Sequence, residues 1–525
     1  MKVLVLDGVS EKGINILKEP GFDVVAIEEK LSEDKLVEMI GEYDAMIVRS
    51  ATKVTARIME HATNLKIIGR AGVGVDNIDV NAATQKGIIV VNAPDGNTIA
   101  AAEQTLALML ALARSVSPAN ENLKKGKWMR KEFVGVELRD KVLGVVGLGR
   151  IGTAVAKRAQ GFEMKTIGYD PYLSEERANA NGIQLMSLEE VFKNADFLTV
   201  HLPLTKETKY LINQETFKIM KDGVRIINVA RGGIIDELAL CEALKSGKVA
   251  GAAIDVFETE PTTESPLFCL ENVVVTPHLG ASTEEAQINV ALDVAYDIVG
   301  VLQGEMAKNA VNMPSIPPEI LKAVKPYLEL GEKLGKFVGQ ICTDFDTIEV
   351  TYAGEISNLN VAPVTTSVLK GVLGALTDEP INFINANLIA KSKGLKIVEA
   401  KQSQEEDYTN LIRVTLAGGK CAKSVAGSLF RNNDARMVMI DDYHIDAIPV
   451  GHMIIAPHID RPKIIGRVGT LIGEHDINIA FMQLGRKELG GRAVMVLGVD
   501  SPVPAETLAA IAKIDGIIDV KFVTL

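Results

Sequence analysis

Three glycines of one short segment have the spacing that a dinucleotide-binding turn requires. Gly147, Gly149 and Gly152 form the pattern GxGxxG, directly after the apolar run 142–146 and before the helical stretch 153–160. The first glycine permits a tight turn, the second lets backbone approach a pyrophosphate, and the third lets helix pack closely on strand. The helix N-terminus adds free N–H donors and a positive dipole. The segment therefore predicts a pyrophosphate site.

An acidic residue completes this pattern. Asp170 stands 18 residues after Gly152, at the end of a second apolar run, 165–169. A carboxylate at that place accepts hydrogen bonds from both hydroxyls of the adenosine ribose, and its charge would repel a 2′-phosphate. NAD is therefore favoured over NADP. Arg150 does not change this preference, because it belongs to the pyrophosphate end of the pattern.

Polar side chains also follow three later apolar runs, where each predicted strand ends. They include Arg231, Glu260 and His278. The carboxyl ends of parallel strands line the cleft of an open α/β sheet, so the three side chains predict one site. Taken alone, each has a structural explanation as a surface cation, a turn carboxylate or a loop histidine. Ser282 and Glu285 form an S-x-x-E capping box, which predicts a helix starting just after the histidine loop.

The elements that position these residues are short apolar runs separated by helical patterns between residues 1 and 277. Continuous apolar strands alternating with helices indicate parallel βαβ units and an α/β fold. Three prolines between Met313 and Pro318 predict a linker. The last 73 residues read as strand, helix, strand, strand, helix, strand, which is the ferredoxin-like order.

With these motifs, the segments Arg49–Lys53, Gly69–Asn77 and His278–Thr283 make the sequence resemble the NAD-dependent D-2-hydroxyacid dehydrogenases, and within that family the phosphoglycerate branch. The resemblance covers essentially the whole chain. It implies oxidation of 3-phospho-D-glycerate to 3-phosphohydroxypyruvate with NAD, the first step of L-serine biosynthesis. The alternatives are another dehydrogenase of this family, acting on glycerate, glyoxylate or 2-hydroxyglutarate, and a NAD-sensing binding protein without turnover.

The resemblance also implies a role for each site residue. His278 would take the hydroxyl proton, Glu260 would orient and stabilise its imidazolium form, and Arg231 would grip the α-carboxylate. Asp255 would reach the nicotinamide carboxamide. The further residues expected to bind the cofactor are Val73, Ile151, Leu202, Pro203, Val229, Ala230, Gly280 and Ala281. Those expected to bind the phosphorylated substrate are Arg49, Ser50, Lys53, Arg70, Gly72 and Arg130. No metal is expected.

The family likeness further implies how the chain divides. We expect a flavodoxin-like substrate domain (1–95 and 283–312) around a Rossmann-type, doubly wound NAD domain (96–282), with hinges near 94–97 and Ser282. An α+β intervening domain with its linker (313–452) and a ferredoxin-like ACT domain (453–525) follow. The intervening domain is expected to respond to an anion or to substrate. The molecule is expected to be an allosteric homo-oligomer, a dimer or tetramer.

In the family, the ACT domain binds L-serine between neighbouring subunits. His458, Asp460 and Asn478 stand at the positions of that motif which contact serine. Their structural explanations are a surface histidine, a helix-capping aspartate and a turn asparagine. Lys463 departs from the motif, which has a glycine there so that backbone can approach the ligand closely.

Composition bounds the remaining possibilities. The chain has 525 residues and a net charge of -12, which repels phosphate backbones and anionic bilayers, so nucleic acid and membrane are not expected as partners. The four cysteines form no CxxC pair, which argues against a zinc site and a disulfide framework and favours a reducing cytoplasm. The opening residues read as a first strand and not as a signal peptide. The apolar stretch 99–113 is too short to span a bilayer and reads as a buried helix.

Overall fold

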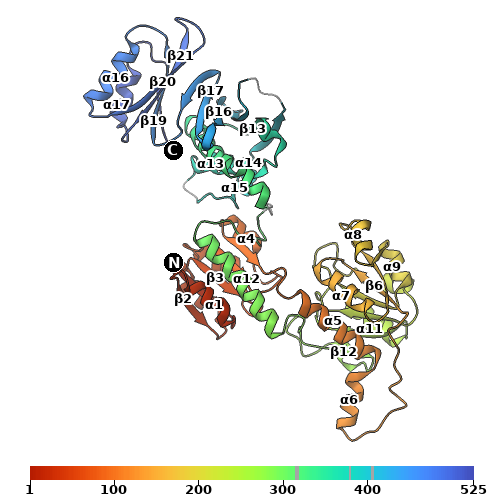
Figure 1. Cartoon of the computed structure of the whole chain (residues 1–525). Coiled ribbons are helices and arrows are strands. Elements are labelled where there is room, and N and C mark those ends of the chain that lie inside the picture. Colours follow the sequence, from red (N-terminus) through yellow and green to blue (C-terminus); the bar gives the residue numbers. More distant parts are fainter. Residues whose placement is uncertain (314–317, 378–379, 404–406) are drawn as a thin grey trace. The chain divides into compact units, whose positions relative to one another are not determined.

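The computed structural model describes residues 1–313, 318–377, 380–403 and 407–525. The chain forms two compact units (Figure 1). One unit comprises residues 1–78 and 90–309, and the other comprises residues 79–89 and 310–525. Residues 79–89, which the sequence places in the substrate segment, thus belong to the C-terminal unit. Most of the predicted proline linker, residues 314–317, lies outside the described residues.

The first sheet of the N-terminal unit has the order β2-β1-β3-β4-β5. Two helices pack together beside it, α1 (Glu11–Lys18) and α12 (Glu284–Leu302), and α12 also contacts β4. The close approach depends on glycine, because a Cβ at Gly13 would lie 2.8 Å from the carbonyl oxygen of Ala291. The strands are β1 (Lys2–Leu6), β2 (Asp23–Ile27), β3 (Ala45–Val48), β4 (Ile67–Arg70) and β5 (Ile89–Asn92).

The second sheet is the doubly wound one that the sequence predicts. Its order is β12-β11-β10-β9-β6-β7-β8, with parallel pairing throughout. The order reverses beside β6, and the crevice at such a point is where this fold binds dinucleotides. The strands are β6 (Val142–Val146), β7 (Lys165–Tyr169), β8 (Gln184–Leu185), β9 (Phe197–Val200), β10 (Val224–Asn228), β11 (Val249–Ile254) and β12 (Val273–Val275).

Two helices precede the first strand of this sheet along the chain. Helix α5 (Thr98–Ala113) is the predicted apolar helix, and it packs on the sheet and on α7 (Arg150–Gln160). Helix α6 (Val116–Lys124) follows α5 after a sharp bend. In the described part of the chain no helix alone is long and apolar enough to cross a membrane, although α5 and α6 pass that test as a bent pair.

The larger domain of the C-terminal unit is a six-stranded sheet of order β14-β13-β15-β16-β17-β18, covered by α13 (Pro318–Ile341) and α14 (Ala362–Gly374). These helices touch backbone to backbone, since a Cβ at Gly335 would lie 2.2 Å from the carbonyl oxygen of Val368. The strands are β13 (Thr347–Gly354), β14 (Lys396–Gln402), β15 (Asn410–Ala417), β16 (Lys423–Leu429), β17 (Ala435–Ile440) and β18 (Tyr443–Ala447).

A disulfide in this domain contradicts the expectation from cysteine spacing. Cys342 and Cys421 are bonded although 79 residues separate them. Cys342 directly follows α13, and Cys421 lies in the loop between β15 and β16. The fold brings these two ends together, and sequence spacing carries no record of that.

The last domain confirms the predicted order of elements. Its antiparallel sheet is β20-β21-β19-β22. The Gln340 side chain of α13 closes one edge, because its amide donates to the Thr524 carbonyl and accepts from the Thr524 N–H, each at 3.0 Å. The elements are β19 (His452–Ile459), α16 (Ile464–Glu474), β20 (Ile479–Arg486), β21 (Arg492–Val499), α17 (Ala505–Ala512) and β22 (Lys521–Thr524).

Candidate active site

A cluster of arginines lies where β4 and β10 end. Arg70 is the last residue of β4, and Arg231 follows β10. Glycines make room for both side chains: a Cβ at Gly72 would lie 1.4 Å from Nη1 of Arg70, and one at Gly74 would lie 1.7 Å from Nη2 of Arg231. The glycines of the predicted motif therefore shape a pocket around guanidinium groups.

The electrostatics of Arg70 suit an anion. Burial, and then the nearby charges of Arg231 and Arg49, lower the pKa of Arg70 to about 10. Its Nε is buried without a hydrogen-bond partner. A buried donor without a partner is costly, and a bound phosphate or carboxylate would satisfy it.

The loop that carries Arg49 is held by two residues that sequence reasoning missed. The Asp7 carboxylate accepts hydrogen bonds from the Arg49 N–H at 2.8 Å and from the Thr52 hydroxyl at 2.7 Å. Asn77 donates to the carbonyl oxygens of Arg49 and Thr52, at 2.7 and 2.6 Å. Asp7 directly follows β1 and has φ 64°. Its place at the carboxyl end of the first strand is the signal that could have marked it, although its partners could not be predicted.

His278 and Glu260 form the contact that acid–base chemistry requires. His278 Nδ1 lies 2.6 Å from Glu260 Oε2, which leaves Nε2 for a reacting group. Glu260 Oε1 accepts from the Phe257 N–H at 2.9 Å. Burial alone would raise the pKa of Glu260, but the hydrogen bonds from His278 and Phe257 and the charge of Arg231 hold it below its ordinary value. The carboxylate therefore stays ionised at neutral pH.

Asp255 fixes the turn that carries His278. Its buried carboxylate accepts from the Thr276 hydroxyl at 2.5 Å and from the N–H groups of Leu279 and Gly280 at 2.8 and 2.9 Å. The His278 N–H also donates to the Asp255 carbonyl. Asp255 thus holds this turn in addition to the cofactor contact that the sequence predicts for it.

The predicted helix start after this turn is wrong by one residue. The N-cap of α12 is Thr283, whose hydroxyl accepts from the Ala286 N–H at 3.1 Å, and Ser282 is exposed. The capping-box pattern fits Ser282, which has Glu285 three residues later, whereas Thr283 has Ala286 at that place. The Ser282 N–H is already bonded to the Leu279 carbonyl within the turn, which leaves Thr283 as the cap.

The glycine fingerprint has the geometry that its spacing predicts. Gly147 has φ 93°, and a Cβ at Gly152 would lie 2.0 Å from the Gly147 carbonyl oxygen. A Cβ at Gly149 would meet nothing within 4 Å, so the space above the turn is open. Helix α7 begins at Arg150, with Gly149 as N-cap. Open space at a helix N-terminus fits a pyrophosphate.

Asp170 stands at the predicted place after β7. Its carboxylate accepts from the N–H groups of Leu148 and Tyr172, both at 2.9 Å. These bonds tie the end of β7 to the glycine turn and fix the carboxylate at the cleft. The Arg150 guanidinium pairs with Asp95 at 2.6 Å, at the predicted hinge.

The other predicted residues lie around these two clusters with one exception. Leu202 and Pro203 follow β9, Val229 and Ala230 follow β10, and Gly280 and Ala281 follow His278. Ser50 and Lys53 are exposed in the loop after β3, while Val73 lies between the two glycines of the arginine pocket. Arg130 is the exception, because it lies in the exposed loop that follows α6. His201, which the sequence prediction omits, follows β9, and burial lowers its pKa to about 4.

The three residues that are predicted to bind L-serine do not meet within one chain. His458 is the next-to-last residue of β19 and pairs with Ala493, which pairs with Arg486 at the end of β20. Asn478 precedes the start of β20, at the opposite end of the sheet, and donates to Asp500 at 2.6 Å. Asp460 follows β19 and contacts Arg486 at 3.2 Å. One chain therefore contributes His458 and Asp460 at one end and Asn478 at the other.

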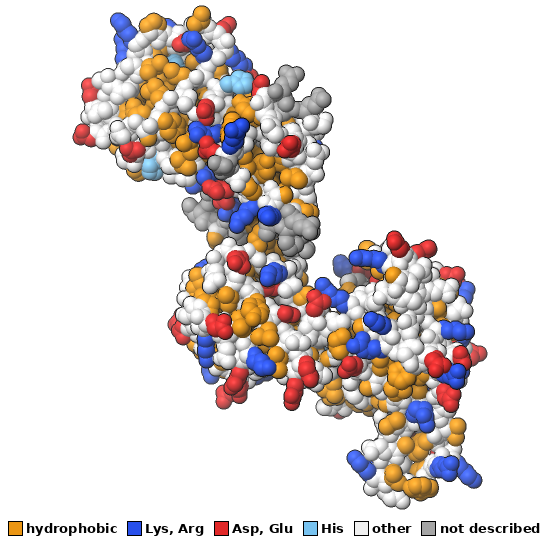
Figure 2. Space-filling model, in the orientation of Figure 1, with side chains coloured by type: hydrophobic (Ala, Val, Ile, Leu, Met, Phe, Trp, Pro, Cys, Tyr) orange, Lys and Arg blue, Asp and Glu red, His pale blue; other side chains and the backbone are white. Residues whose placement is uncertain are grey.

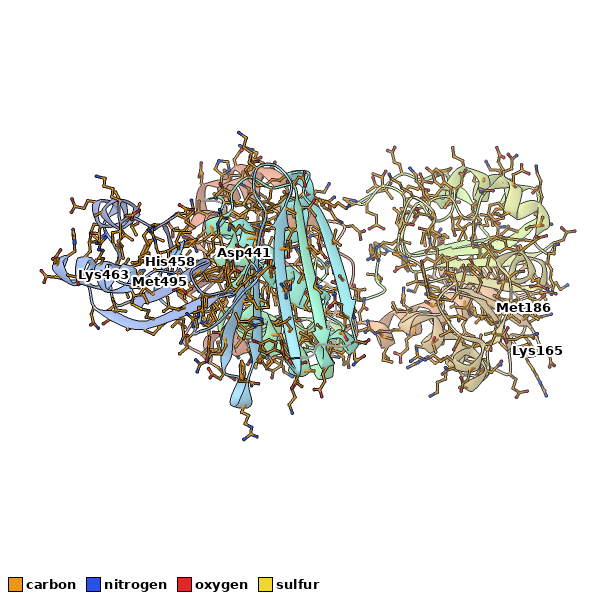
Figure 3. The ribbon with its side chains drawn as sticks, turned by 90° about the horizontal axis from the view of Figure 1, so that it is seen from above. Lys165, Met186, Asp441, His458, Lys463 and Met495 are labelled. Atoms are coloured by element: carbon orange, nitrogen blue, oxygen red, sulfur yellow. A yellow bond between two sulfur atoms is a disulfide. The ribbon has the colours of Figure 1, made fainter. Side chains whose placement is uncertain are left out.

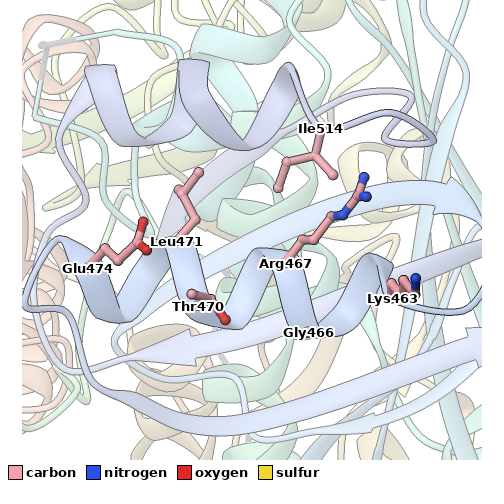
Figure 4. Close-up of a pocket in the computed structure, with 7 residues that line it drawn as sticks. All are labelled: Lys463, Gly466, Arg467, Thr470, Leu471, Glu474 and Ile514. Carbon is pink, nitrogen blue, oxygen red and sulfur yellow. The ribbon is translucent and has the colours of Figure 1, made fainter.

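Lys463 is the N-cap of α16 and has φ 77°, the left-handed conformation that glycine adopts easily. It lies in the same domain as the buried His458 (Figure 3). Its side chain lines an open surface pocket of about 550 Å³ between α16 and the end of α17 (Figure 4). The other lining residues are Gly466, Arg467, Thr470, Leu471, Glu474 and Ile514.

Comparison with known families finds three domains along the chain, in the order that the sequence predicts. Residues 106–280 match the NAD-binding domain of the D-isomer specific 2-hydroxyacid dehydrogenases. Residues 323–441 match the D-3-phosphoglycerate dehydrogenase intervening domain, and residues 454–516 match the ACT domain.

Curated proteins similar to the whole chain share one name. A D-3-phosphoglycerate dehydrogenase of Methanocaldococcus jannaschii is 48% identical over 100% of both chains. One of Archaeoglobus fulgidus is 46% identical, also over 100% of both. Among solved structures, the TT0316 protein of Thermus thermophilus is 35% identical with a TM-score of 0.55, covering 59% of this chain and 100% of its own. The apo D-lactate dehydrogenase of Escherichia coli is 28% identical with a TM-score of 0.53, over 59% and 100%.

Proposed function

The chain belongs to the D-3-phosphoglycerate dehydrogenase family, and on that premise we propose how its own residues oxidise 3-phospho-D-glycerate to 3-phosphohydroxypyruvate. The enzyme is a NAD-dependent dehydrogenase of serine biosynthesis. When bound, NAD would supply the acceptor for the hydride that leaves C2. The glycine turn, the N-terminus of α7 and the Asp170 carboxylate would hold it.

His278 carries the proton step. Its Nε2 takes the proton of the C2 hydroxyl as the hydride leaves, and Glu260 at Nδ1 stabilises the imidazolium that forms. Glu260 performs this role because it stays ionised. In the reverse direction the same nitrogen returns the proton to the carbonyl oxygen.

The arginine pocket binds the two acidic ends of the substrate. Arg231, next to Glu260, takes the α-carboxylate, because a planar guanidinium matches a carboxylate in two hydrogen bonds. Arg70, with its unpartnered Nε, and Arg49 take the phosphate, with Lys53 and Ser50 at the rim. Gly72 keeps the floor of this pocket open for Arg70.

The observation that carries the proposal is the His278–Glu260 contact beside an arginine cluster and an open glycine turn. The experiment is NADH formation at alkaline pH with 3-phosphoglycerate, compared with glycerate, lactate and 2-hydroxyglutarate. We expect the highest kcat/KM with 3-phosphoglycerate. Preference for an unphosphorylated acid would instead indicate another dehydrogenase of the wider family, and tight NADH binding without turnover would indicate a sensor.

We also propose that the chain assembles into a homo-oligomer through the arm formed by α6 and residues 125–137. Apolar side chains gather on this arm (Figure 2). Trp128 is 81% exposed and Val134 is 83% exposed. Large apolar side chains so exposed favour burial against a second copy. Arg130 lies on the same arm, so the partner's active site is the place where it would act. Mass measurement in solution for the wild type and Trp128→Glu tests this assembly.

L-serine is the effector that we propose for the ACT domain. Because His458 and Asn478 lie at opposite ends of one sheet, a site containing both needs two subunits. Lys463 occupies the left-handed position beside it, where its side chain hinders close approach. Calorimetric titration of serine into the wild type, Lys463→Gly and Asn478→Ala tests this. We expect weak wild-type binding that Lys463→Gly strengthens; no heat in any of the three would refute it.

A further inference from the structure

We propose that Asp76 is a positioning residue that decides which donors of Arg231 are open to the substrate carboxylate. This inference rests on the proposed function, in which Arg231 binds that carboxylate. Asp76 follows β4 and Arg231 follows β10, so their contact joins loops of the two sheets of the N-terminal unit.

Two of the five N–H donors of Arg231 are used within the chain. Its Nε donates to Asp76 Oδ2 at 3.0 Å, and its Nη1 donates to the Ala230 carbonyl at 2.7 Å. One N–H on Nη1 and both on Nη2 remain. A ligand carboxylate therefore meets the Nη1 and Nη2 end of the guanidinium, because Asp76 occupies the edge at Nε.

Residues 74–76 have the shape that this arrangement needs. A Cβ at Gly74 would collide with Nη2 of Arg231, at 1.7 Å, so only glycine admits the guanidinium here. The same Cβ would lie 2.8 Å from Asp76 Oδ2. Asn77, the next residue, is anchored by its hydrogen bonds to the Arg49 and Thr52 carbonyls. The loop thus presents a gap for Nη2 and a fixed acceptor for Nε.

The charges around Arg231 explain why such an acceptor is needed. Arg70 and Arg231 repel each other, and Asp76 acts on Arg70 in the opposite sense. Without a hydrogen-bond acceptor at Nε, nothing at that edge would hold the guanidinium of Arg231 in place against this repulsion. The Asp76 side chain is 66% exposed, so the ion pair contributes little to stability, and orientation is its main effect.

The test uses Asp76→Ala and Asp76→Asn in the full-length enzyme. Asp76→Ala removes the acceptor, and we expect kcat/KM for 3-phosphoglycerate to fall by roughly 10- to 100-fold while KM for NAD stays unchanged. Asp76→Asn keeps an oxygen for the Nε donor and should recover most of that loss. Gly74→Ala, whose methyl group meets Nη2, should repeat the selective loss independently.

Asp222→Ala is the matched control. Asp222 is an exposed aspartate that pairs with Lys248 at 2.7 Å, before the amino ends of β10 and β11, whereas Arg231 follows the carboxyl end of β10. Its loss should leave both kinetic constants unchanged. An Asp76→Ala enzyme as active as the wild type, or an Asp76→Asn enzyme as impaired as Asp76→Ala, would overturn the inference. A wild type that does not oxidise 3-phosphoglycerate would overturn the proposed function instead.

Discussion

At the scale of single residues, the proton step gives the most direct prediction. His278→Ala should lower kcat by roughly 10² to 10⁴, the usual contribution of a positioned acid–base group, and leave NADH affinity intact. Steady-state kinetics and an NADH titration measure the two effects. His475→Ala, an exposed histidine that contacts the Leu471 carbonyl, is the control. A nearly normal kcat in His278→Ala would remove this residue from the mechanism.

Glu260→Gln should change the pH profile of kcat/KM while leaving the fold intact. Because the lowered pKa of Glu260 keeps its carboxylate charged as the pH falls, it favours the protonated imidazole of His278. An amide removes that preference, so the base form persists to lower pH. We expect the acidic limb of the kcat/KM profile for oxidation to move to lower pH. A limb that moves upward or stays in place would contradict the contact's electrostatic role.

Lys463 carries backbone strain that a single substitution removes. A residue other than glycine or asparagine in the left-handed region costs about 1 kcal/mol, so Lys463→Gly should raise the free energy of unfolding by that amount. Lys513→Gly is the control, because Lys513 has φ -83° and should lose stability as glycine. Urea unfolding of both variants measures the difference, and destabilisation by Lys463→Gly would show that the lysine side chain has a compensating contact.

Single residues also show which contacts could be predicted from the sequence and which could not. The glycine turn and Asp170 could be predicted because their constraints act between residues that are close in the sequence. Such constraints fix the spacing of the residues, and the spacing can be read directly. Asp7, Asn77 and the Cys342–Cys421 bond were not predicted, since their partners are 42, 28 and 79 residues away. Contacts of that kind depend on which strand ends the fold brings together.

At the scale of elements, the start of α12 is decided by one hydroxyl group. Thr283→Ala should cost about 1 kcal/mol, the usual value of an N-cap, whereas Ser282→Ala should cost almost nothing because Ser282 is exposed. Urea unfolding of the two variants compares the two registers directly. Equal losses would mean that both hydroxyl groups share the cap.

Apart from this helix start, strands and helices were predicted correctly where the pattern of apolar residues extends over several residues. The strand Lys165–Tyr169 is confirmed to the residue, and the order of the last six elements is confirmed. Helix α7 starts three residues earlier than predicted, at Arg150, because the fingerprint glycine at 152 lies inside the helix, where it packs on Gly147. The predicted start of a helix is thus wrong where a glycine lies inside the helix for close packing and does not mark its end.

At the scale of the whole molecule, the segment 79–89 gives a prediction about how it is attached to the rest of the C-terminal unit. Asn382 donates to the Gly87 carbonyl at 2.6 Å, and Asn312 donates to the Ile88 carbonyl at 2.8 Å. Asn382→Ala should cost about 1–3 kcal/mol locally, because it leaves a carbonyl without its donor. Hydrogen exchange of residues 79–89 should become faster, while Asn120→Ala, an exposed asparagine, should leave it unchanged. Unchanged exchange in Asn382→Ala would show that the segment is held by other contacts. Nothing in the local sequence of 79–89 marks this attachment.

The Gln340 side chain at β22 has a consequence for how copies of this chain can meet. An edge strand offers its free N–H and C=O groups to any other strand, and proteins protect such edges to avoid uncontrolled pairing. The Gln340 side-chain amide acts here as a peptide group would, because it binds both outward groups of Thr524, and its nitrogen also donates to the Lys336 carbonyl. A single side chain therefore occupies the sheet edge at Thr524, and the opposite edge strand, β20, contacts β18 of the preceding domain. Both edges of this sheet thus carry contacts within the chain, which limits how a sheet shared between two copies could form.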